Sequence, residues 1–256
     1  MHASDVASPD GPRAGHAIVV ADGDVASRAA LDAAWPGWAD GSTTVIAADG
    51  GFARALALGL RPTVLVGDLD SLDPAVAAAA EASGVDVRRA AVDKDESDAE
   101  LALLAAVGAG VARITVLGAF GGARLDHALA NVWLLAHPAL AGVAVVLLDA
   151  AARVSLVVAP GPDGLPVTRP LPGPTGTLVT LLPFGGDATG VTTAGLRYPL
   201  RDEPLRSGPA RGLSNVRVAT DAAVTARAGR LLVVELPPAG IPPGTALPPA
   251  GLSSAP

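Results

Sequence analysis

Short apolar runs alternate with alanine-rich segments over the first 150 residues. The runs are continuously apolar, and most end in glycine or aspartate. They predict strands over residues 16–21, 43–48, 64–66, 85–91, 114–117 and 143–148. Between the strands the pattern predicts helices over 52–58, 74–82, 98–107 and 125–136. Continuously apolar strands that alternate with helices are typical of a parallel sheet covered on both faces.

The pattern changes after about residue 150, where helical periodicity disappears. Strand-like runs separated by turns rich in glycine and proline follow, at 154–158, 177–182, 188–192, 216–218, 223–226 and 231–236. Such a series predicts an antiparallel β-sandwich or barrel. We therefore expect a Rossmann-like α/β domain over 15–150 and an all-β domain over 151–237. The polar N-terminal segment 1–14 and the Pro/Gly/Ala-rich segment 238–256 are predicted to be disordered tails.

Composition narrows the class of protein. The chain has 256 residues, half of them apolar, and it contains no cysteine, which excludes disulfides, thiolate metal sites and a cysteine nucleophile. The net charge is −7 without a basic run, which argues against a nucleic-acid partner. The longest apolar stretch, 101–112, is too short to cross a bilayer. No secretory signal is recognisable, so we expect a cytoplasmic protein with no membrane partner.

Two carboxylates follow the predicted strand 64–66. If the chain stays extended, Asp68 and Asp70 point the same way and crowd each other. Two unit charges 4 Å apart repel by roughly 4 kcal/mol at an effective dielectric of 20. Such a pair requires a cation, a shared proton or open water. Taken alone, this turn is more simply a strand-to-helix connection capped by Ser71 or Asp73.

Four such turns, however, follow strands of the same predicted sheet: 49–51, 67–71, 93–98 and 121–127. In a parallel sheet all four lie at one edge, where ligands bind in open α/β folds. Oxygen ligands with few nitrogens favour Mg²⁺, which usually binds substrate phosphates as well. Arg124 and Lys94, the only lysine of the chain, could bind those phosphates directly. The set therefore predicts a phosphate-transfer site.

Other phosphate and metal motifs fail on spacing. An EF-hand loop starting at Asp93 requires glycine at its sixth position and glutamate at its twelfth, where this chain has Asp98 and Leu104. The chain contains no GxxxxGK[ST] motif, and no GxGxxG follows the first predicted strand. The candidate site is therefore neither an EF-hand nor a P-loop.

Taken together, the motifs resemble those of the thiamine pyrophosphokinase (thiamine diphosphokinase) family. They are ADGG at 48–51, GDLDS at 67–71, DKDESDAE at 93–100, GGARLDHALAN at 121–131, GVTTAGLRYPL at 190–200 and GLSN at 212–215. The resemblance covers roughly residues 16–237. It implies an ATP-binding α/β domain, a β-sandwich that binds thiamine, and a homodimer with its active site between the subunits. It also implies Mg²⁺-dependent transfer of pyrophosphate from ATP to the thiamine hydroxyl, which gives thiamine diphosphate and AMP.

The resemblance also implies roles for single residues. The expected metal ligands are Asp68, Asp70 and Asp98, and the expected catalytic residues are Asp70, Asp98, Arg124 and Asp126. The expected ATP and phosphate site comprises Asp49, Gly50, Gly51, Lys94, Gly121, Gly122 and Arg124. The expected thiamine site comprises Asp126, Ser214 and Asn215. One departure concerns the thiamine ring, because Val216-Arg217-Val218 follows Asn215 where some relatives have an aromatic residue.

Two alternative functions stay open at this point. A diphosphokinase acting on another alcohol, such as a hydroxymethylpterin, would use the same first domain and differ around 212–215. A non-catalytic nucleotide- or thiamine-binding protein would not need so many mutually repelling carboxylates.

Overall fold

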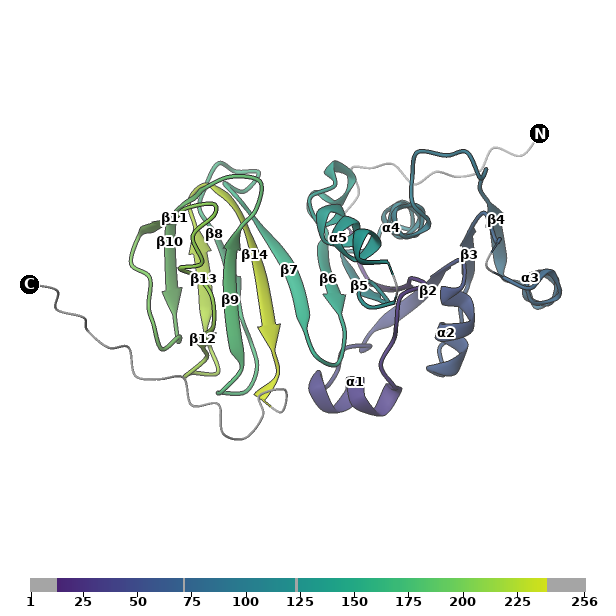
Figure 1. The fold of residues 1–256 in the computed structure, drawn as a ribbon, viewed down its shortest axis with the longest axis horizontal. Coiled ribbons are helices and arrows are strands. Elements are labelled where there is room, and N and C mark those ends of the chain that lie inside the picture. The colour runs from purple at the N-terminus through teal and green to yellow at the C-terminus, as the bar shows by residue number, and fades with distance from the viewer. Residues whose placement is uncertain (1–12, 71, 123, 239–256) are drawn as a thin grey trace, which may run out of the picture.

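The computed structural model describes residues 13–70, 72–122 and 124–238. Its main feature is a ten-stranded sheet that runs through both halves of the molecule (Figure 1), with strand order β12-β9-β14-β7-β6-β5-β1-β2-β3-β4. A second sheet, in the order β11-β10-β13-β8, covers one end of it. The predicted tails lie outside the described residues, apart from residues 13, 14 and 238.

Six parallel strands form the first half of the large sheet, as predicted. They are β1 (His16–Val20), β2 (Ser42–Ala48), β3 (Val64–Gly67), β4 (Asp86–Arg89), β5 (Arg113–Leu117) and β6 (Ala144–Leu148). Every residue of β1 is buried, and successive side chains belong to cores on opposite faces of the sheet. A strand covered on both faces needs apolar residues throughout, which explains its continuous apolar run.

Helices cover both faces of this parallel half. They are α1 (Arg28–Ala34), α2 (Gly51–Ala57), α3 (Pro74–Ala82), α4 (Asp98–Gly108) and α5 (Leu125–Leu134), with a short 3₁₀ helix η1 (Pro138–Leu140). Asp73 caps α3 by accepting from the amide of Ala75, and Ser97 caps α4 by accepting from that of Glu100. Helix α1 was not predicted, because it has seven residues and buries only Leu31, too few for a visible periodicity.

The second half is entirely β, as predicted. Its strands are β7 (Arg153–Ala159), β8 (Val167–Pro170), β9 (Leu178–Pro183), β10 (Ala188–Ala194), β11 (Glu203–Leu205), β12 (Asn215–Val216), β13 (Ala223–Ala226) and β14 (Gly229–Leu236). Strands β8 and β11 were not predicted; both are short and contain proline. One apolar core, which includes Val157, Val191 and Val233, fills the space between the two sheets.

The two halves share one sheet because β7 pairs antiparallel with β6, from Val146 opposite Ser155 to Leu148 opposite Arg153. The sequence did not predict this continuity. A tight turn at 149–152 joins the two strands. Within the described residues, no helix is long and apolar enough to span a membrane.

His16 is a buried polar residue at the start of β1. Its Nε2 lies 2.9 Å from the hydroxyl of Thr115, and its Nδ1 lies 3.1 Å from the carbonyl oxygen of Asp40. Burial lowers the pKa of His16 from its ordinary value, and Arg113 lowers it further; the bond to the Asp40 carbonyl only partly opposes this. The folded protein therefore favours the neutral imidazole.

This burial predicts a loss of stability in mild acid. Below the ordinary imidazole pKa of about 6.5, the unfolded chain takes up a proton that folded His16 resists. The free energy of unfolding should therefore fall with pH by up to about 1.4 kcal/mol per unit until the lowered folded pKa is reached. Urea unfolding between pH 7.5 and 5 should show less of this fall in His16→Gln than in the parent or in the control His127→Gln, which alters an exposed histidine. Equal pH dependence in all three proteins would contradict the assignment.

Candidate active site

The turn after β3 brings two carboxylates together. The strand ends at Gly67, and Leu69 adopts a left-handed backbone with φ of 62°. The amide of Asp70 donates to Oδ1 of Asp68 at 3.2 Å. The extended conformation considered for this pair is therefore wrong. A compact turn, and not strand periodicity, brings the Asp68 and Asp70 carboxylates together. A positive φ at leucine is strained, and such strain is concentrated at functional sites.

A third carboxylate joins them from the end of the neighbouring strand β2. Asp49, Asp68 and Asp70 each place one oxygen within 4.8 Å of the others. Asp49 is buried and Asp70 is exposed, so the cluster opens from the interior toward solvent. Asp49 was predicted as a phosphate-site residue, whereas the structure groups it with the predicted metal ligands. Three carboxylates this close attract a cation strongly.

The predicted metal ligand Asp98 lies beside this cluster, at the start of α4, and binds Lys94. The Lys94 ammonium is 2.8 Å from Oδ1 of Asp98 and 3.4 Å from Oδ2 of Asp68. The hydrogen bond to Asp98 raises the pKa of Lys94 above its ordinary value. The amide of Asp70, with help from Lys94, holds the pKa of Asp68 below its usual range. Lys94 therefore neutralises part of the negative charge.

Gly67 allows this close arrangement. Its φ is +149°, and a Cβ on it would lie 3.2 Å from both Cβ of Asp49 and Oδ1 of Asp98. A side chain at this position would push the two acidic residues apart. The glycine that ends β3 is thus a steric requirement of the carboxylate cluster.

The turn after β1 adds two acidic residues that were not predicted for the site. Oδ2 of Asp24 accepts from the amide of Gly122 at 2.7 Å, and Asp22 pairs with Arg54 at 3.3 Å. A Cβ on Gly50 would lie 2.3 Å from Oδ1 of Asp22. The signal was present in the sequence, because Asp22-Gly23-Asp24 follows the first strand just as the other acidic turns follow theirs.

The predicted glycines have identifiable packing roles. A Cβ on Gly51 would lie 2.1 Å from the carbonyl oxygen of Val20, so α2 packs directly on the backbone of β1. Gly121 and Gly122 have φ values of 78° and 76°, which favour glycine. Gly51 thus lets α2 approach β1 closely, while Gly121 and Gly122 permit the left-handed backbone at 121–122.

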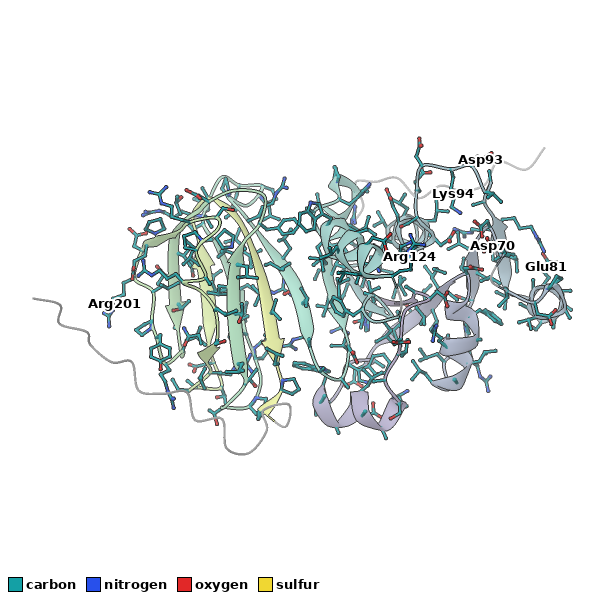
Figure 2. All side chains as sticks on the ribbon, viewed as in Figure 1. Asp70, Glu81, Asp93, Lys94, Arg124 and Arg201 are labelled. Atoms are coloured by element: carbon teal, nitrogen blue, oxygen red, sulfur yellow. The ribbon has the colours of Figure 1, made fainter. Side chains whose placement is uncertain are left out.

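Arg124 and Asp126 lie at the start of α5 and bind each other. Their side chains are 66% and 64% exposed, and Nη2 of Arg124 lies 2.6 Å from Oδ2 of Asp126. The Arg124 guanidinium holds the pKa of Asp126 far below its usual range. Figure 2 shows Arg124 in the same half of the molecule as Asp70 and Lys94. The pair is accessible to a ligand and already charged.

The predicted thiamine residues Ser214 and Asn215 lie far from the carboxylates within one chain. Asn215 belongs to β12, and seven strands separate β12 from β3 in the sheet. Eight inter-strand steps of about 4.8 Å span roughly 38 Å. The structure therefore does not bring the two predicted substrate sites together in one subunit.

Asn215 borders a cavity of about 190 Å³. The buried Asn215 side chain accepts from the amide of Tyr198 at 3.0 Å and donates to the Tyr198 carbonyl at 2.7 Å. Tyr198, the only tyrosine of the chain, and Leu213 also line this cavity. An aromatic residue absent from the local sequence around Asn215 is thus supplied from 17 positions upstream.

The structure defines an α/β protein with an attached β domain, in which carboxylates gather at the ends of parallel strands beside Lys94. Comparison with known families makes this specific. Residues 37–147 match the family model "Thiamin pyrophosphokinase, catalytic domain", and residues 168–231 match "Thiamin pyrophosphokinase, vitamin B1 binding domain". The two models together cover more than half of the chain. The chain belongs to the thiamine pyrophosphokinase family.

Individual relatives agree with this assignment. The chain is 26% identical to the thiamine pyrophosphokinase of Bacillus subtilis (strain 168) over 179 residues, covering 70% of this chain and 80% of the relative. The crystal structure of thiamine pyrophosphokinase from Bacillus subtilis matches with a TM-score of 0.72 at 24% identity, covering 87% of this chain and 99% of that one. The enzyme from Geobacillus thermodenitrificans gives 0.69 at 25% identity, covering 86% and 97%.

The contacts of Lys94 predict a cation-dependent stability. In Lys94→Gln, Asp68 and Asp98 lose their shared cation, which should lower the free energy of unfolding by about 1–2 kcal/mol, since the pair is partly buried. Millimolar Mg²⁺ should raise the melting temperature more in this variant than in the parent, because the ion replaces the lost charge. The control Arg88→Gln removes the exposed pair with Asp86 and should respond to Mg²⁺ as the parent does. Equal Mg²⁺ shifts in all three would contradict this reading.

Proposed function

We propose that this protein transfers pyrophosphate from ATP to the hydroxyl of thiamine, giving thiamine diphosphate and AMP, with Mg²⁺. The observation that supports the proposal most is the cluster of Asp49, Asp68 and Asp70 beside Lys94, in a chain whose two halves match the two domains of one family. The finer description also belongs to this proposal: a Rossmann-like ATP-binding domain to about residue 150, then a β-sandwich that binds thiamine.

Mg²⁺ fits the donor set of this chain. Three carboxylates with one oxygen each inside a 4.8 Å cluster form a hard, negatively charged set, which suits a small divalent cation. We propose Asp68 and Asp70 as ligands, with Asp49 as the added candidate and Asp98 as the neighbour that Lys94 holds. When bound, the ion would neutralise charge that develops on the phosphates.

Each cation of the site is paired with carboxylates, and phosphate oxygens could take the place of those carboxylates. Lys94 lies against Asp98 and Asp68, and Arg124 lies against Asp126. Phosphate oxygens of ATP would compete for both cations, and the guanidinium can bind them by two parallel hydrogen bonds. We propose that Lys94 and Arg124 exchange carboxylate partners for phosphate when ATP binds.

The transfer itself needs little covalent chemistry from the protein. The thiamine hydroxyl oxygen attacks the β-phosphorus, the bond from that phosphorus to the bridging α–β oxygen breaks, and AMP leaves with the bond electrons. The hydroxyl proton passes to a carboxylate, for which Asp98 and Asp126 are both candidates. Either becomes a better acceptor once its cation has moved to the phosphates, because the opposite charge no longer stabilises its ionised form.

We propose that thiamine occupies the 190 Å³ cavity beside Asn215. Both polar atoms of the Asn215 side chain already bind the backbone of Tyr198, so Asn215 positions that segment. Ser214 adopts a left-handed backbone with φ of 57° at the same place, and its amide donates to Thr180. Tyr198 is half exposed and lines the cavity, which makes it the candidate to pack against a thiamine ring.

We infer that a homodimer completes the active site. Because Asn215 and the carboxylates lie at opposite ends of one sheet, a second copy would supply one of the two sites. Helix α5 presents Leu125, Leu129 and Trp133 to solvent, 73%, 52% and 62% exposed, directly after Arg124. These three residues form one stripe at helical spacing, and an exposed apolar stripe beside a site indicates an interaction surface.

The expected cytoplasmic location stays a prediction. A diphosphokinase for another alcohol would differ mainly in the cavity around Asn215, and a binding protein without catalysis would bind the same ligands without releasing AMP.

A product assay tests the activity. With ATP, Mg²⁺ and thiamine, the protein should release AMP and thiamine diphosphate in equal amounts, while a hydroxymethylpterin should give neither at a comparable rate. Asp70→Asn should lower turnover at least 100-fold, because it removes a charge from the cluster but lies exposed at a turn, outside the core. The control Asp163→Asn alters an exposed aspartate of the β domain. Release of ADP, or binding of thiamine without turnover, would contradict the pyrophosphokinase proposal.

The dimer proposal has a separate test. Leu129→Glu should convert the protein to a monomer by light scattering and remove most activity, because a charge on the α5 stripe opposes burial against a second copy. Leu56→Glu is the matched control, since Leu56 is 51% exposed on α2. A fully active monomer in either protein would exclude a site shared between subunits.

A further inference from the structure

A second, larger cavity lies away from the carboxylate cluster. Its volume is about 270 Å³, and its walls come from the end of α1, the starts of β5 and β7, and the connection after β8. Trp35, Trp38, Arg113, Arg153 and Arg217 are among its lining residues. Helix α1 lies at the bottom of Figure 1, whereas the labelled Asp70, Lys94 and Arg124 lie in the upper half of Figure 2. None of the predicted site residues lines it.

The walls of this cavity carry an excess of positive charge. Over residues 13–70, 72–122 and 124–238, Glu235 is the one carboxylate that binds the lining arginines: it accepts from Arg153 at 2.8 Å through both oxygens and also binds Arg217. Arg113 donates to the carbonyl oxygen of Asp40 at 2.7 Å, and among the described residues it forms no salt bridge. Three cations thus face one carboxylate, and uncompensated charge near the interior is costly.

The excess of positive charge is clearest at Arg217. Its side chain is fully buried, and its Nε has no hydrogen-bond partner in the part of the chain that the structure describes. A buried guanidinium with an unused N–H is unusual, because buried polar groups are nearly always hydrogen-bonded. A fourth arginine, Arg169, interacts electrostatically with both Glu235 and Arg153. The region therefore favours an anion.

Two indole rings line the same cavity. The indole N–H of Trp35 donates to the carbonyl of Asp149 at 2.7 Å, and that of Trp38 donates to Oδ1 of Asp32 at 2.8 Å. With their N–H groups bound elsewhere, the rings offer mainly apolar and π surface to the cavity. Arg153 already lies 4.8 Å above the ring of Trp35, which holds both groups in place.

We propose that this cavity binds a small organic anion in which a phosphate or carboxylate is attached to a planar ring. The guanidinium groups bind the anion by charge-assisted hydrogen bonds, and the indoles pack against the ring. The volume lies just below the roughly 300–1,000 Å³ of pockets for drug-sized ligands, so the ligand is smaller than a nucleoside triphosphate. Because one wall belongs to α1 and another to the connection after β8, the ligand would link the two halves of the chain.

Tryptophan fluorescence tests the proposal directly. The chain has three tryptophans, so Trp133→Phe leaves only the two that line this cavity. Phenyl phosphate and benzoate, titrated separately, distinguish the two anionic groups; at least one should change the emission saturably. Inorganic phosphate has the anionic group without the ring, and phenol has the ring without the anionic group. Each should bind at least tenfold more weakly than the ring anion that changes the emission. A signal that never saturates, or phenol binding as tightly as either ring anion, would overturn the proposal.

Variants in the same Trp133→Phe background locate the binding. Arg113→Gln should raise the dissociation constant about tenfold, because it removes an exposed cation of the wall. Arg113→Lys keeps the charge, so its dissociation constant should lie between those of Arg113→Gln and the Trp133→Phe parent. Circular dichroism checks that both variants fold, and Arg88→Gln is the control at the far edge of the sheet. Unchanged affinity in Arg113→Gln, or displacement of phenyl phosphate by saturating ATP with Mg²⁺, would overturn the proposal. Because this readout needs no turnover, it stands or falls independently of the pyrophosphokinase activity.

Discussion

Charge repulsion at the ends of two parallel strands is the constraint on which the site depends. Asp49, Asp68 and Asp70 crowd their oxygens within 4.8 Å, although each would be better solvated apart. Several features of the fold allow this arrangement: the missing side chain at Gly67, the left-handed Leu69 and the ammonium of Lys94. Such an arrangement is understandable if a cation and phosphates take over the neutralisation, as we propose.

The continuous sheet determines how the two halves can cooperate. Pairing of β6 with β7 fixes the β domain beside the α/β domain, and it also holds Asn215 roughly 38 Å from the carboxylates. Because the two halves share one sheet, the β domain of a subunit cannot bring Asn215 to the carboxylates of the same subunit. The homodimer proposed above would resolve this conflict, because the exposed stripe on α5 lies next to Arg124 and could pack against the β domain of a second copy.

Much of the fold could be predicted because its signals are local. The six parallel strands are continuous apolar runs, and α3 and α4 begin with capping residues that the sequence displays openly, Asp73 and Ser97. Elements with weak local signals were missed: α1 buries a single leucine, and β8 and β11 are three or four residues long with proline. The pairing of β6 with β7 was missed although it is local, because the change of pattern near residue 150 was interpreted as a boundary between two separate domains.

The sequence by itself indicated most of the candidate carboxylates and the strand ends at which they lie, because strand period and chain direction are local properties. It also supplied the family, through motifs in a fixed order. Only the tertiary structure decided that Asp49 joins the carboxylates, that a turn and not an extended strand sets the approach of Asp68 to Asp70, and that Asp22 and Asp24 belong nearby. The same holds for the arginine-lined cavity between the halves, whose walls come from segments up to about 180 residues apart. Apart from the local turn at 68–70, these features depend on distances between segments far apart in the chain, and such distances are fixed only when the sheet and its cores form.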